Sequence, residues 1–284
     1  LNLDLVDIAN YEAQFEATSL NKVVPTGVTF DAVLPTTAAI RTAILTNPLS
    51  VRGTDGGKLL DTFIEGFTST ERQRLTGAIR QGFFEGQTNF QIIKNIRGTK
   101  ALGYNDGILA TTSRNAGAIV RTAVQHVSTQ ARMETLKENS DVVQQVELVA
   151  TLDSKTTQVC RSLDKRRFPI DSGPRPPLHI NCRTTVIAVT SFSSLFSKDA
   201  TRASVGDTGG RQVSADLSYY DWLKQQPAAF QDKAIGPTRA KLLRDGGLST
   251  ERFSELQLDR NFSPLTLEQM KALEPLAFER AGIQ

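Results

Sequence analysis

Two cysteines and two histidines are the scarcest reactive side chains in this 284-residue sequence, and three of the four fall in one stretch. Cys160 lies in LDSKTTQVC, and His179 and Cys182 lie in PPLHINCR. Two thiolates and an imidazole are ligands that suit zinc. A structural zinc site has four ligands, so Asp153, Asp164 or a water molecule would complete it. The spacing predicts a metal site at Cys160, His179 and Cys182, with zinc as the candidate cofactor.

The same residues are compatible with three other roles. A disulfide between Cys160 and Cys182 would close a loop of roughly 20 residues and stabilise the fold by about 3 kcal/mol. The side chains could also be packed thiols and a satisfied histidine. A cysteine–histidine pair near Asp153 and Thr156 could form a nucleophile. However, the sequence has no nucleophile elbow, phosphate loop or dinucleotide fingerprint, and it lacks the deaminase pattern. We therefore expect no enzyme, and keep as the alternative a metal-dependent hydrolase or toxin-like enzyme centred on Asp153, Cys160, His179 and Cys182.

Composition limits the class of protein. Hydrophobic residues make up 39% and charged residues 22% of the chain, which is typical of a globular protein. No run of about 18 apolar residues is present, so we expect no membrane helix and no membrane partner. The first residues lack the basic and apolar regions of a signal peptide, and two cysteines do not make a disulfide scaffold. We expect a protein that folds in a reducing cytosol.

Positive charge is concentrated around the cysteines. The net charge of +3 is too small to indicate a general nucleic-acid binder. Residues 153–183 nevertheless hold seven basic and three acidic residues, and seven minus three gives +4. This stretch is either a solvated loop or a surface that contacts phosphate or carboxylate groups. The candidate partner or DNA contacts are Arg161, Lys165, Arg166, Arg167 and Arg175.

Helical signals dominate the first half of the chain. A capping-box pattern at Thr68 predicts a helix that ends near Gly86. A second pattern at Thr88 predicts a helix closed by Gly98. A stripe of small and branched residues predicts a longer helix over 113–137, and the small side chains on it indicate close helix packing.

The period then changes to that of strands. Residues 146–152 alternate between apolar and polar, and 184–190 are β-branched, so both predict strands. About 30 residues separate them, which is long for a structureless loop in a compact domain. Such a loop either has a function or is held in one shape by a local cross-link, such as a metal ion or a disulfide.

These elements define an α+β protein. A helical N-terminal half leads into a small antiparallel β unit with a Cys/His-containing loop, followed by an extended linker and a helical C-terminal tail. The aromatic residues Trp222, Phe230 and Phe253 of that tail are either its own core or a binding surface. The expected divisions are an N-terminal segment of unknown role over 1–67, a main domain over 68–190, a linker over 191–217 and the tail over 218–284.

The segment TLDSKTTQVCRSLDKRRFPIDSGPRPPLHINCRTTV, residues 151–186, resembles the signature of the phage Mu F-like minor head proteins, the head-morphogenesis family of tailed bacteriophages. The resemblance extends over roughly residues 70–190. One departure is Lys165, where the family pattern has a glycine. The positions that match are Thr151, Asp153, Thr156, Cys160, Asp164, Phe168, Pro176, Pro177, His179, Cys182 and Arg183, and in the preceding helix Arg121, Thr122, Ser128, Ala131 and Arg132.

The resemblance implies a structural protein of the phage head. Such a protein would be a minor capsid component of the virion, in the capsid interior or at the portal vertex, after assembly in the host cytoplasm. Its partners would be the portal protein and the major capsid protein, with double-stranded DNA as a further contact. The Cys/His loop would then hold its basic edge in one shape toward a partner, because ordering a long loop only on binding costs affinity.

Overall fold

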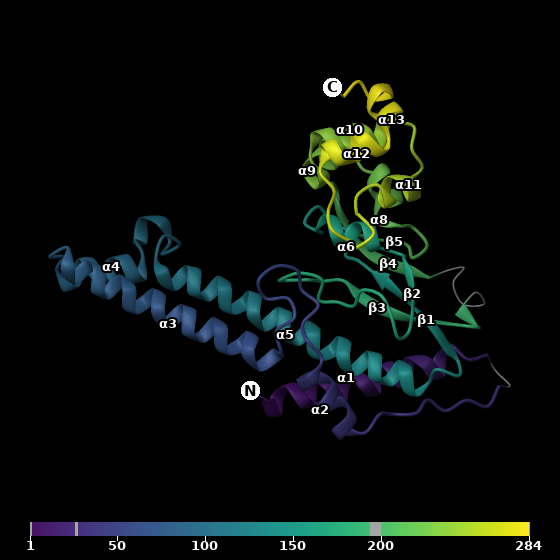
Figure 1. The fold of residues 1–284 in the computed structure, drawn as a ribbon, viewed down its shortest axis with the longest axis horizontal. Helices are drawn as coiled ribbons and strands as arrows, with labels where there is room; N and C mark the ends of the chain where they lie inside the picture. The colour runs from purple at the N-terminus through teal and green to yellow at the C-terminus, as the bar shows by residue number, and fades with distance from the viewer. Residues whose placement is uncertain (1, 26–27, 194–199, 284) are drawn as a thin grey trace. The chain divides into compact units, whose positions relative to one another are not determined.

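A computed structural model describes residues 2–25, 28–193 and 200–283. The chain divides into two compact units (Figure 1). The first unit is made of Leu1–Ala13, Pro35–Glu134 and His179–Cys182, and the second of Gln14–Leu34, Thr135–Leu178 and Arg183–Gln284. The division falls within two long helices, so each of these helices contributes residues to both units.

The N-terminal half is helical, as predicted. Its elements are α1 (Asn2–Lys22), α2 (Thr37–Thr46), α3 (Leu60–Phe84), α4 (Asn89–Arg97), the 3-10 turn η1 (Lys100–Leu102) and α5 (Ile108–Glu138). The predicted capping box of α4 is confirmed, since Thr88 and Gln91 exchange hydrogen bonds and Gly98 follows the helix.

Helix α3 begins earlier than its sequence signal. The sequence predicts a start at Thr68, but the helix starts at Leu60. Leu60 and Phe63 are buried in the core of the first unit, and this burial starts the helix before the polar signal is reached. The Thr68 hydroxyl instead donates to Ile64 O inside the helix, 3.2 Å away.

The core of the first unit lies where α1, α2, the start of α3 and α5 meet. On α5, the predicted stripe is buried at Ala123, Val127 and Ala131, but Val120 is 60% exposed. The stripe is therefore covered only along its second half. The remaining core members are Leu5, Ala9, Ala13, Ile40, Ile44, Leu49, Val51, Leu60 and Phe63.

The second unit contains a three-stranded antiparallel sheet. Its strands are β1 (Val143–Val149), β2 (Arg167–Pro169) and β3 (Thr185–Thr190), in the order β2-β1-β3. Val146 in the central strand pairs with Phe168 on one side and Ala188 on the other. A short helix, α6 (Gln158–Leu163), lies in the chain between β1 and β2. The two strands predicted from the sequence are present, although β1 spans 143–149 and not the predicted 146–152. Strand β2 is an addition from within the loop.

Residues 191–217 were expected to be an extended linker, and much of this segment has regular structure instead. Strands β4 (Thr201–Gly206) and β5 (Gly209–Ser214) form an antiparallel hairpin, whose turn ends at Gly209 with φ of +101°. The N–H of Val205 donates to Leu152 O at 2.8 Å, which attaches the hairpin to the chain after β1. Small polar residues in both strands conceal the hairpin in the sequence. Residues 194–199 lie outside the described part of the chain.

The C-terminal tail is helical, as predicted. Tyr219, Tyr220, Trp222 and Phe253 are almost completely buried, with their rings packed edge to face. Together with Phe230 they form the core of the tail rather than an exposed binding surface. The helices are α8 (Tyr219–Lys224), α9 (Ala228–Ile235), α10 (Pro237–Asp245), α11 (Thr250–Glu255), α12 (Leu267–Leu273) and α13 (Pro275–Arg280).

The protein therefore belongs to the α+β class, with a helical N-terminal half, a small antiparallel sheet and C-terminal helices. None of the helices in the described ranges is both long enough and apolar enough to span a membrane.

Candidate functional site

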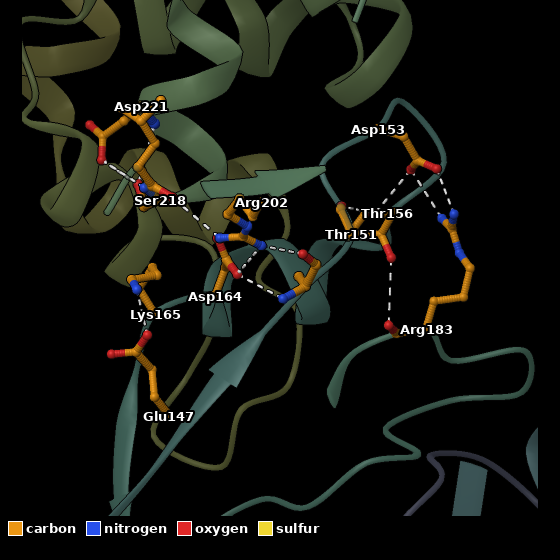
Figure 2. Close-up of polar contacts among 12 residues, drawn as sticks. Glu147, Thr151, Asp153, Thr156, Asp164, Lys165, Arg183, Arg202, Ser218 and Asp221 are labelled. Atoms are coloured by element: carbon orange, nitrogen blue, oxygen red, sulfur yellow. Dashed lines mark hydrogen bonds and ion pairs between the residues drawn. The ribbon is translucent and has the colours of Figure 1, made fainter. Parts of the chain in front are cut away.

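The turn after β1 is built by the polar residues of the motif (Figure 2). Asp153 accepts a hydrogen bond from the N–H of Lys155 at 2.9 Å, the local turn that an aspartate favours. The Thr156 hydroxyl lies 2.5 Å from Thr151 O and 3.0 Å from Asp153 Oδ1. The Tyr219 hydroxyl donates to Asp153 O at 2.8 Å and so ties the turn to the tail. The motif residues fix the shape of the turn that leads into α6.

Asp153 is also paired with Arg183, which precedes β3. The guanidinium nitrogens of Arg183 lie 2.5 and 3.0 Å from the two carboxylate oxygens (Figure 2). Burial would raise the pKa of Asp153, but hydrogen bonds from Arg183 and the Lys155 N–H outweigh it and hold the pKa below its usual value. Asp153 is therefore an ionised carboxylate whose oxygens are already engaged.

Asp164 ends α6 and is buried. Its carboxylate accepts the N–H of Ala150 at 2.7 Å and two hydrogen bonds from Arg202 at 3.0 Å each. The same guanidinium also donates to Ala150 O and Leu217 O. Burial raises the pKa of Asp164, and Arg202 opposes that shift. The motif aspartate thus fastens the β4–β5 hairpin to the end of β1.

Lys165 explains the glycine of the family pattern. Its backbone is left-handed, with φ of +66°, a conformation that glycine adopts at little cost. The turn continues the sheet, because the N–H of Lys165 donates to Leu148 O at 2.8 Å. The ammonium group lies 2.5 Å from the buried carboxylate of Glu147 (Figure 2). This ion pair is an interaction that a glycine could not make.

The five basic residues expected to contact a partner do not form one exposed surface. Arg161 is only 8% exposed and donates to Thr156 O and Ala234 O. This burial removes it from the predicted surface, since the two backbone carbonyls that its guanidinium contacts lie inside the second unit.

The other four remain at least partly accessible. Lys165 and Arg167 both pair with Glu147, and Arg175 is half-buried and donates to Pro169 O and Pro174 O. Burial lowers the pKa of Arg175. Arg166 is half-buried, and the side chain of Arg167 is 55% exposed. Much of the local positive charge therefore takes part in contacts within the second unit and is not available to a partner.

His179 and Cys182 lie in a tight turn that packs on α5. The N–H of Cys182 donates to His179 O at 3.1 Å, and Asn181 between them has φ of +60°. Arg121 of α5 donates to Asn181 Oδ1 at 2.8 Å, and Thr122 Oγ1 accepts the N–H of Asn181 at 3.0 Å. These contacts give two of the motif residues of the preceding helix, Arg121 and Thr122, a physical role, which is to hold the His179–Cys182 turn.

The local geometry of His179 suits a metal ligand. Its Nδ1 lies 2.7 Å from Ile180 O, an arrangement that assigns the ring proton to Nδ1. Metal-binding histidines commonly donate their second ring N–H to a carbonyl in this way. Cys160 and Cys182 are both buried, at 2% and 3% exposed. His179 and Cys182 belong to the first unit and Cys160 to the second, and the zinc site stays a prediction.

Neither aspartate named as a fourth ligand is open to a metal. Arg183 occupies the carboxylate of Asp153, and Arg202 with the Ala150 N–H occupies that of Asp164. A zinc ion bound by the two cysteines and His179 would therefore take water or another donor as its fourth ligand.

Sequence reasoning missed Glu147 and Arg202. Glu147 alternates with apolar neighbours in β1, which predicts a solvated side chain, yet it is 3% exposed between two cations. Arg202 lies in the segment expected to be a linker, and no spacing in the sequence connects it with Asp164. An acidic residue inside a strand opposite a basic loop was the one available signal.

These features define an α+β protein in which the polar residues of the motif mainly support the β unit. Residues 73–187 match the family Phage Mu protein F like protein. This part of the chain is therefore phage Mu F-like, and the match includes α4, all of α5 and the Cys/His loop. No curated protein and no solved structure matches the chain.

The match confirms the resemblance drawn from the sequence motif. It indicates a phage protein of head morphogenesis, a structural class, with the virion as its location. The matched region starts within α3 and ends within β3, so it covers parts of both units.

Proposed function

We propose that this chain is a structural minor capsid protein of a tailed bacteriophage that acts by binding other head proteins during assembly. The observation that carries the proposal is the phage Mu F-like match over residues 73–187, which contains the whole 151–186 motif. The proposed location is the portal vertex and inner head, and the proposed partners are the portal protein and the major capsid protein.

The geometry of the motif supports a binding role. In the enzyme alternative, Asp153 would assist a cysteine or a metal-bound water, but both of its oxygens accept hydrogen bonds from Arg183. A carboxylate held in this way, with a lowered pKa, is a poor general base. The residues of the motif instead connect the sheet, α6, the hairpin and the tail.

DNA contact has narrower support than protein binding. Arg161 is buried, and Lys165 and Arg167 share the carboxylate of Glu147. DNA contact through this loop would fall mainly to Arg166 and to the exposed side of Arg167. Such contacts would weaken steeply with salt, since binding to phosphates releases counterions.

Co-purification with the portal oligomer of the same phage tests the proposal. The chain and the purified portal are mixed at low and high salt, and the complex is isolated by size-exclusion chromatography. Retention at both salt concentrations supports an interface with a substantial apolar part. Retention at low salt alone supports a mainly charged interface. Absence of binding to the portal in both conditions contradicts the portal assignment, and the major capsid protein is then tested in the same assay.

A further inference from the structure

One part of the first unit has almost no core of its own. Between residues 64 and 121, where every residue is described, only Gly82, Gly98 and Gly107 are buried. We call this segment, 64–121, the arm. It consists of most of α3, all of α4, and the first part of α5, and Figure 1 shows α3 and α5 running side by side there.

Polar contacts and close backbone approach hold the arm together in place of a core. Glu71 of α3 accepts hydrogen bonds from Thr112 and Asn115 of α5, at 2.5 and 3.0 Å. These bonds hold the pKa of Glu71 below its usual value. Ile92 of α4 packs on Gly82, where an added Cβ would lie 2.6 Å from Ile92 Cγ1. The arm is thus ordered without burying its large apolar side chains.

Those side chains are presented to solvent. Along α3, Leu75, Ile79 and Phe83 follow at four-residue spacing, which places them on one side of the helix, and their exposure rises from 37% to 48% to 76%. On α4, Phe90 and Ile93 are 76% and 58% exposed. Isolated exposed apolar residues need no explanation, but a helical stripe of them that ends in exposed phenylalanines indicates a binding surface.

The charge of the arm indicates what can cover this surface. The arm, residues 64–121, holds eight basic and four acidic residues, and eight minus four gives +4, more than the +3 of the whole chain. A second copy of the arm would bring like charges together, which disfavours self-association. Duplex DNA would match the charge but would leave the phenylalanines without apolar contacts. A protein groove with an apolar floor and carboxylates at its rim matches both properties.

We propose that the α3–α4 face of the arm docks into an apolar groove, rimmed by acidic side chains, on another protein of the phage head. The anchors would be Phe83 and Phe90, because exposed aromatic residues contribute most when an interface buries them. The exposed cations Arg72, Arg80 and Lys94 would pair with the acidic rim. This proposal rests on the proposed head function and names the surface that carries it.

The test measures retention of the chain in head particles that contain no DNA. The wild-type chain is co-expressed with the portal, scaffold and major capsid proteins of its phage, and copies per purified particle are quantified. We expect Phe83→Ser with Phe90→Ser to lower retention by about tenfold or more. The matched control is Leu273→Ser with Leu276→Ser, which alters two residues of α12 and α13 that are 58% and 61% exposed.

The outcomes separate the two proposals. Retention of wild type and control with loss of the arm variant supports the docking surface. Equal retention of all three overturns the docking surface and leaves the head function standing. Failure of the wild type to join the particles overturns the head function and the inference that rests on it. Far-UV circular dichroism and thermal unfolding establish that the arm variant is folded, which its exposed positions lead us to expect.

Charge-reversal variants distinguish a protein groove from DNA as the partner that covers the arm. Arg72→Glu with Arg80→Glu should lower retention in the DNA-free particles, whereas Lys233→Glu with Lys271→Glu, exposed in the tail, should not. A variant that loses binding to a DNA duplex but keeps full retention in the particles would identify DNA as the occupant and overturn the proposal.

Discussion

The guanidinium of Arg202 in β4 meets the carboxylate of Asp164, at the end of α6, through two parallel hydrogen bonds of 3.0 Å each (Figure 2). The carboxylate is fully buried and the arginine side chain is 10% exposed. This pair joins a motif residue to a hairpin that the sequence does not reveal. It also accounts for the aspartate in the motif, whose role here is to anchor structure.

Without Arg202, the protein should unfold more easily. Arg202→Met leaves the charge of Asp164 buried without its counter-ion, and we expect the free energy of unfolding to fall by about 3–5 kcal/mol. Adding Asp164→Asn to Arg202→Met should recover part of that loss, because the uncompensated charge is then gone. Urea unfolding measures both variants. Arg211→Met, at an exposed position of β5, is the control. If Arg202→Met is as mild as this control, the pair is not a structural anchor.

The buried His126 of α5 should make stability depend on pH. Burial lowers its pKa from 6.5 to about 4, although hydrogen bonds to the backbone of Ile44 and Asn47 oppose the shift. The neutral ring is stable in the folded state, and Nε2 has no hydrogen-bond partner among the described residues. Below pH 6.5 the unfolded chain binds a proton that the folded chain does not, so the unfolding free energy falls as pH falls.

The size of this effect follows from the shift. Each pKa unit corresponds to about 1.4 kcal/mol, so His126 should remove roughly 3 kcal/mol between pH 6.5 and pH 4. Urea unfolding of wild type and His126→Gln over this range measures the difference. The wild-type curve should be steeper with pH than that of the variant. Parallel curves would contradict the assignment.

Lys165 should tolerate glycine but not a β-branched residue. Glycine relieves the left-handed backbone but loses the ion pair with Glu147, and these opposing effects should keep Lys165→Gly within about 1 kcal/mol of wild type. Lys165→Val loses the ion pair and keeps the backbone strain. We therefore expect its free energy of unfolding to be about 1–2 kcal/mol lower than that of Lys165→Gly. Thermal unfolding of both variants tests this order. Equal melting temperatures would contradict it.

Asp153 should determine the order of the turn after β1. Asp153→Ala removes the bonds to Arg183 and to the Lys155 N–H, and we expect a loss of about 1–2 kcal/mol after allowing for the partly exposed arginine. Limited proteolysis should become faster within residues 151–183. Asp171→Ala, at an exposed position of the same loop, is the matched control. Unchanged proteolysis of Asp153→Ala would show that the turn is held by other contacts.

Zinc binding by Cys160, His179 and Cys182 remains a prediction with a direct measurement. Elemental analysis of the chain purified without chelator should find about one zinc per chain, and His179→Ala or Cys182→Ser should lower that content strongly. If Cys182→Ser has the same zinc content and the same protease resistance in the loop as the wild type, then neither a metal site nor a staple exists there. Less than about a tenth of an equivalent in the wild type would leave packing as the role of these residues.

The sequence by itself determined the class of fold, several of its main elements and the resemblance of residues 73–187 to the phage Mu F-like family. The period of 3.6 in α5 and the capping box at Thr88 are local signals with which the structure agrees. The alternation after residue 145 predicts a strand correctly, but burial along β1 does not follow it, since Glu147 is buried. The 151–186 motif is specific because several residue types must occur at fixed spacing, and the family match agrees with it. Local physics, in which neighbours along the chain set turns, caps and periods, carries this information.

Only the tertiary structure decided what the charged and aromatic residues do. The pairs Asp164–Arg202 and Glu147–Lys165 join residues from different elements, and no spacing along the chain encodes them. The same holds for burial: Arg161 and Trp222 are enclosed, while Phe83 and Phe90 face solvent. Hydrophobicity alone predicts an exposed Arg161 and buried phenylalanines. The prediction is wrong for these residues because burial depends on which elements pack together and not on residue type alone.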